Sequence, residues 1–193
     1  MGIVRRTARA GTLPGLHAPA AGFEAPFEML AACHERVERM LALIGRLQQH
    51  LREHGCDEAA RRAACDVMRY FDIAAPQHHL DEELHVFPPL LAGPDAGLRA
   101  LVQRLLQDHR DMEAAWPAAR GVLQAVAKSP AADWTPLAPS QTGALNRFAA
   151  LYGRHLQDED RLAYPAARAA LTADALRAMS RDMMQRRGVP AAT

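Results

Sequence analysis

The feature that most constrains the fold is the spacing of apolar residues along four long stretches, at residues 27–54, 57–91, 97–128 and 141–170. In each stretch, apolar side chains recur three and four residues apart, as in Val37, Leu41 and Ile44. This period places them on one narrow face of an α-helix. Helices with such faces pack as a left-handed bundle. The pattern therefore predicts an all-α protein, an up-down-up-down four-helix bundle.

The segments on either side of the four stretches predict two smaller parts. Residues 1–26 are rich in glycine and proline and predict an extended N-terminal arm. Thr172 is a favourable N-cap for a short C-terminal helix that ends before Gly188. The expected organisation is an arm at 1–26, a bundle at 27–170, and a short helix and tail at 171–193.

Composition limits the classes of function. Alanine is abundant and aromatic residues make up 5% of the chain, which favours helices over sheets. The formal net charge of +1 argues against a nucleic-acid or membrane-surface protein, because both usually carry a large basic excess. No stretch is long and apolar enough for a membrane span. Cys33, Cys56 and Cys65 form no CxxC pair, so they predict reduced thiols in a cytoplasmic protein.

Each of the four stretches carries a histidine on its apolar face: His34, His79, His109 and His155. A single histidine in such a place is more often a hydrogen-bonded core residue than a metal ligand. Every buried imidazole needs a partner, and four unrelated partners at the same level of one bundle are improbable. One histidine on each helix therefore indicates a shared partner at the centre.

Glutamates follow three of these histidines by four residues, a spacing that places both side chains on the same helix face. A buried carboxylate is costly unless its charge is compensated, and a bound metal ion is the simplest compensation. The sequence therefore predicts a metal site. Its expected residues are His34, His79, Glu83, His109, Glu113, His155 and Glu159.

The second stretch offers another pair with the same spacing, His78 and Glu82. This pair is rotated by about 100° from His79 and Glu83. The apolar stripe that includes Phe87 and Leu90 continues through 79 and 83, so His78 and Glu82 are expected in the outer shell of the site or on the surface. If the helix were rotated by one residue, the assignment would be reversed.

A weak internal repeat relates the second and fourth stretches. The segment from His79 to Glu83 resembles the segment from His155 to Glu159, and an aromatic–proline step follows each, at Phe87–Pro88 and Tyr164–Pro165. The repeat is imperfect, because the aromatic residue lies four positions after Glu83 but five after Glu159. It predicts a pseudo-symmetric two-metal site, in which the aromatic rings either cap the site against water or belong to the core.

These residues carry a resemblance to a known family. The set His34, His79-x3-Glu83, His109 and His155-x3-Glu159, with the phrases HHLDEELHVFPPL and HLQDEDRLAYP, resembles the hemerythrin-like, HHE cation-binding family over about residues 27–170. The resemblance implies a four-helix bundle with a non-haem di-iron centre. It also implies that the four histidines are terminal ligands and that Glu83 and Glu159 bridge the ions.

Two departures from the oxygen-carrying hemerythrins are visible. Those proteins have a fifth histidine where this chain has Glu113. Their last carboxylate is an aspartate five residues after the fourth histidine, the position of Asp160, whereas Glu159 of this chain follows the HHE spacing of four. Both differences argue against reversible oxygen carriage. Ferritin-like di-iron proteins are the nearest rival, but their Glu-x-x-His motif has the opposite order and a different spacing.

Imidazole and carboxylate ligands suit iron, with manganese or zinc as alternatives. We expect two iron ions with open positions for O2, NO or peroxide. A binding or sensing protein is favoured over a di-iron oxidase, peroxidase or NO-detoxifying enzyme, because neither an electron route nor a substrate pocket is evident. The sequence does not identify a redox partner.

Overall fold

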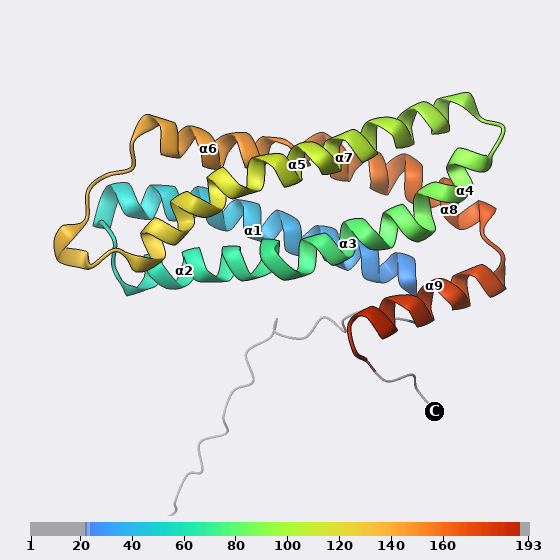
Figure 1. Cartoon of the computed structure of the whole chain (residues 1–193), viewed down its shortest axis with the longest axis horizontal. Coiled ribbons are helices and arrows are strands. Elements are labelled where there is room, and N and C mark those ends of the chain that lie inside the picture. Colours follow the sequence, from blue (N-terminus) through green and yellow to red (C-terminus); the bar gives the residue numbers. More distant parts are fainter. Residues whose placement is uncertain (1–21, 23, 190–193) are drawn as a thin grey trace, which may run out of the picture.

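The computed structural model describes residue 22 and residues 24–189. The N-terminal arm expected at 1–26 therefore lies outside the described residues, except for its last few positions. Within the described part every regular element is helical and no strand occurs, which confirms the all-α prediction. The helical segments form long rods that lie side by side and run alternately in opposite directions, with a shorter helix beside one end (Figure 1).

The first rod is α1 (Pro26–His54) and the third is α5 (Ala96–Lys128). The second and fourth rods are each built from several segments. The second consists of α2 (Glu58–Arg69), the π-helical turn η1 (Tyr70–Ala74), α3 (Ala75–Asp81), the π-helical turn η2 (Glu82–Val86) and α4 (Phe87–Ala92). A short 3-10 turn, η3 (Ala131–Asp133), precedes the fourth rod. The fourth consists of α6 (Pro139–Ala150), α7 (Tyr152–Asp158), the π-helical turn η4 (Glu159–Ala163) and α8 (Tyr164–Ala170).

Each π-helical turn is followed, after one intervening residue, by a proline: Pro76, Pro88 and Pro165. Proline has no N–H group for the α-helical bond, and its ring crowds the carbonyl four residues earlier. A π-helical turn just before the proline takes that carbonyl out of the α-helical register. The turn also inserts one extra residue, so the side chains that follow are displaced by one position relative to a regular helix.

The buried apolar residues form two clusters, one at each end of the bundle. In α1, Leu30 belongs to one cluster and Val37 to the other, and His34 lies between them. The same order occurs in α5, where His109 separates Leu105 from Met112. The helical seams therefore continue through the bundle, and a polar layer interrupts them at one level.

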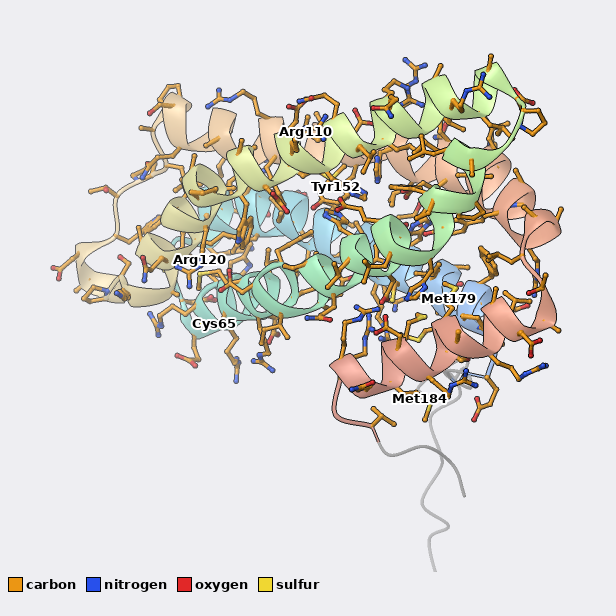
Figure 2. All side chains as sticks on the ribbon, turned by 45° about the vertical axis from the view of Figure 1, so that its right-hand side comes forward. Cys65, Arg110, Arg120, Tyr152, Met179 and Met184 are labelled. Atoms are coloured by element: carbon orange, nitrogen blue, oxygen red, sulfur yellow. The ribbon has the colours of Figure 1, made fainter. Side chains whose placement is uncertain are left out.

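The short helix beside the rods is α9 (Ala173–Arg186). Thr172 is its N-cap, because the Thr172 side chain accepts a hydrogen bond from the Ala175 N–H. Met179 is fully buried and faces the bundle, as Figure 2 shows. At the other end of α9, Arg186 and Arg187 donate hydrogen bonds to the fully buried Asp81. These contacts hold α9 against the last residue of α3, directly before Glu82.

Among residues 22 and 24–189, no helix combines the length and apolar character that a bilayer crossing requires.

Candidate metal centre

Six buried side chains meet in the polar layer between the two apolar clusters, and together they form the six-residue centre. Each is no more than 3% exposed. They are His34 from α1, His78 from α3, Glu82 from η2, His109 from α5, His155 from α7 and Glu159 from η4. Their nitrogen and oxygen atoms fall into two groups whose members lie within 4.8 Å of one another. One group comprises His34, His78, Glu82 and Glu159, and the other His109, His155 and Glu159.

The two glutamates connect the groups. Oε2 of Glu159 lies 3.2 Å from Nε2 of His34, while its Oε1 lies 3.1 Å from Nε2 of His155. Glu82 is placed in the same way: its Oε1 is 3.4 Å from Nε2 of His78 and its Oε2 is 3.4 Å from Nε2 of His109. Each carboxylate thus presents one oxygen to each group, which is the arrangement of a carboxylate that bridges two ions.

The atoms of this centre are poorly satisfied by the protein itself. In the described part of the chain, Nε2 of His78, Nε2 of His109, Oε2 of Glu82 and both carboxylate oxygens of Glu159 are buried without a hydrogen-bond partner. A buried polar atom left in this state costs about 1–3 kcal/mol. Two cations placed between these atoms would remove that cost, so the residues present fit a pair of metal ions.

Three of the four histidines are held from behind by a carboxylate. Nδ1 of His34 lies 2.9 Å from Asp160 and Nδ1 of His109 lies 2.8 Å from Glu83. His155 Nδ1 lies 3.3 Å from Asp108. A histidine that binds a metal commonly donates its other N–H to such a carboxylate, which fixes the ring and turns the free nitrogen toward the ion.

The charges of the centre are strongly coupled. Burial alone would lower the pKa of His34, but contacts with Asp160, Glu159 and Glu82 raise this pKa to about 12. In the same way, contacts with Glu159, Glu82 and Glu83 overcome burial and raise the pKa of His109 to about 11. Without an ion, protons on these two imidazoles compensate the buried carboxylates, and a metal ion would take over that role.

Four of the seven residues predicted for the site belong to the six-residue centre: His34, His109, His155 and Glu159. The other three lie outside both groups of converging atoms. His79 is buried, and its ring stacks on that of His109 with centroids 3.9 Å apart. Burial and the neighbouring His109 lower the pKa of His79 to about 3, so the ring is neutral.

Glu83 and Glu113 are both exposed. Glu83 supports His109 from behind, through its contact with Nδ1, instead of pointing between the ions. Glu113 lies off the seam, because the buried stripe of α5 continues from His109 to Met112, three residues later. Their expected places as ligands are therefore not supported by the geometry.

The sequence interpretation missed His78 and Glu82, which it placed in the outer shell of the site or on the surface. The expected stripe stepped back from Phe87 by four residues, as in an α-helix, and reached Glu83. The Phe87 N–H instead bonds to the carbonyl of Glu82, five residues earlier, across η2. Glu82 is therefore the residue one turn before Phe87.

The internal repeat contained the missing signal. Tyr164 lies five residues after Glu159, and its N–H bonds to the Glu159 carbonyl across η4. Counting five residues back from Phe87 gives Glu82, and four more gives His78. The segments from His78 to Pro88 and from His155 to Pro165 then match without a gap.

A small cavity of about 60 Å³ lies beside the centre. Its lining is mostly apolar and includes Phe71, Met112 and Trp116, together with His79 and Glu113. His79 stands between this cavity and His109, on whose ring it stacks. The cavity has room for a small molecule such as a diatomic ligand.

Comparison with known proteins agrees with this geometry. A family model described as the hemerythrin HHE cation-binding domain matches residues 25–167. An uncharacterized protein from Haemophilus influenzae (strain ATCC 51907 / DSM 11121 / KW20 / Rd) is 32% identical over 165 residues. That match covers 85% of this chain and 91% of the relative.

Proposed function

The chain belongs to the hemerythrin HHE cation-binding family, and we propose that it holds two iron ions in the six-residue centre and uses them to bind or sense O2, NO or peroxide. One observation carries the proposal: two groups of buried ligand atoms share Glu159, and Glu82 also reaches both. Two ions bridged by these carboxylates are the simplest occupants of the two groups.

The donor set favours iron. The centre consists of four imidazoles and two carboxylates, and among the described residues no cysteine joins either group. Structural zinc usually prefers thiolates and a closed tetrahedral site, whereas imidazole with carboxylate suits iron and also manganese. Two bridging carboxylates also place the ions close enough to act on one small molecule.

The centre leaves room for that molecule. If each ion takes about six ligand atoms, the pair offers about twelve positions. Four imidazoles would fill about four, the bridging carboxylates about four more, and a shared hydroxide about two. About two positions would stay open. The small cavity lies on the other side of His79 from His109, so a small molecule could approach the centre from there.

Nearby negative charge favours the oxidised ions. Three more carboxylates, those of Asp160, Glu83 and Asp108, touch the histidines from behind. Negative charge close to a metal ion stabilises its higher charge state. We therefore propose that the reduced centre is oxidised readily and does not carry O2 reversibly.

The test is to expose the reduced, iron-loaded protein to O2, NO or H2O2 and record optical spectra. We expect one O2 addition to oxidise the iron and degassing to leave it oxidised. With a reductant and excess H2O2 or NO, consumption should stop after a few equivalents per chain. Recovery of the reduced spectrum on degassing would contradict the proposal, and sustained consumption would identify an enzyme instead of a sensor.

A further inference from the structure

One difference between the two halves of the centre is the aromatic residue beside each. Phe87 and Tyr164 occupy equivalent places in the repeat, each five residues after a bridging glutamate and directly after a π-helical turn. The ring of Phe87 lies 5.6 Å from that of His109. The ring of Tyr164 stacks on that of His34, with centroids 5.1 Å apart. The equivalent positions thus differ by a single hydroxyl group.

That hydroxyl lies among the ligand atoms of the first group. The Tyr164 oxygen is 2.8 Å from Nε2 of His34 and donates a hydrogen bond to Oε1 of Glu82. Both of these atoms face the position of one ion, because His34 and Glu82 belong to the group of four that also contains His78. The side chain is buried, with 6% of the residue exposed.

The spacing of these atoms is that of neighbouring ligands on one ion. Metal–ligand bonds of about 2.1 Å at right angles place adjacent ligand atoms about 3 Å apart. Within the first group, Nε2 of His34 is 3.2 Å from Glu159 and 3.8 Å from Glu82. The 2.8 Å separation between Nε2 of His34 and the Tyr164 oxygen is also close to the separation of adjacent ligand atoms.

We propose that Tyr164 binds, as a phenolate, the ion held by His34 and His78. This inference rests on the proposed function, because it requires an ion in the first group. The phenol proton passes to solvent water when the oxygen–metal bond forms, as from any ligand that must deprotonate. The ion then has five protein ligands, whereas the ion at His109 and His155 has four and faces the apolar ring of Phe87.

The two ions would then have different roles. A phenolate adds negative charge to the first ion and fills one of its positions, so this ion favours the ferric state and is largely closed. The one remaining open position is then on the ion at His109, whose ring stacks on that of His79. Small oxidants should bind there.

The experiment uses the three tyrosines of the chain. Tyr70 and Tyr152 are matched controls, because Tyr70 donates its hydroxyl hydrogen bond to the Cys33 carbonyl and Tyr152 packs in the aromatic cluster around Phe71. The iron-loaded, oxidised protein is examined by visible absorption and by resonance Raman spectroscopy. A phenolate on iron(III) gives a charge-transfer band and enhanced tyrosinate ring vibrations.

We expect both signals in the unchanged protein and in Tyr70→Phe and Tyr152→Phe, and their loss in Tyr164→Phe with two irons still bound. If Tyr164→Phe does not fold, the double variant Tyr70→Phe/Tyr152→Phe decides, since any signal it gives comes from Tyr164. Two bound irons without a tyrosinate signal would overturn this inference alone. A protein that takes up no iron would overturn the proposed function together with it.

Discussion

Replacing Glu82 by alanine should abolish the paired site, whereas replacing Glu83 should leave two ions bound. Glu82 is fully buried, and its oxygens face His78 on one side and His109 on the other. Its loss would remove one ligand from each ion. It would also remove a negative charge that offsets the repulsion between the two cations. Glu83 only supports His109 from behind, and losing such a contact typically lowers metal affinity about 10- to 100-fold.

The measurement is iron stoichiometry and affinity for the two variants, prepared in parallel. We expect at most one equivalent of iron in Glu82→Ala and close to two in Glu83→Ala. Glu113→Ala is a matched control, because Glu113 is an exposed glutamate outside both groups and should bind like the unchanged protein. If Glu83→Ala lost the ions and Glu82→Ala kept them, the account would be wrong. Glu83 would then face the centre, as the α-helical period predicts.

Removing the metal should lower the melting temperature by about 10 °C or more. When the free concentration of an ion is about a thousand times its dissociation constant, binding stabilises the folded state by about 4 kcal/mol. For a domain of this size, each kcal/mol shifts the melting temperature by about 2–4 °C. Protons on His34 and His109 compensate part of the loss, so the stripped bundle should stay folded at room temperature.

Thermal unfolding followed by circular dichroism tests this, with chelated protein before and after anaerobic addition of Fe(II). The Glu82→Ala variant is the control, since iron should raise its melting temperature less than that of the unchanged protein. Equal melting temperatures for the stripped and reloaded protein would show that the bundle does not depend on its ions.

The fold and the histidine layer were predictable because both depend on a regular period. The seam of α5 runs through Val102, Leu105, His109 and Met112 as a continuous α-helix, and all four are buried as the spacing predicts. The same argument placed His34 and His155 correctly in the layer. Hydrophobic periodicity located the histidines of α1, α5 and α7. It was less exact for the carboxylate of α5, because the buried stripe continues from His109 to Met112 and leaves Glu113 exposed.

The register of the second rod was not predictable from periodicity, because η2 inserts one residue between Glu82 and Phe87. A proline in the sequence does not by itself predict a π-helical turn, since Pro117 lies inside the regular α-helix α5. The comparison with Glu159 and Tyr164 was the better guide, because equivalent turns repeat the same spacing. The contacts of Asp108 and Asp160 with the histidines were not predictable, because a helical period alone does not show which residue outside the seam contacts a neighbouring rod.

The most direct test of the central claim is the metal content of the protein. It is purified from iron-replete cells, and a second sample is stripped with a chelator and reconstituted with Fe(II) without oxygen. Elemental analysis should find close to two equivalents of iron per chain in the reconstituted sample, and iron as the main transition metal in the first. Well under one equivalent of any transition metal in both samples would contradict the account.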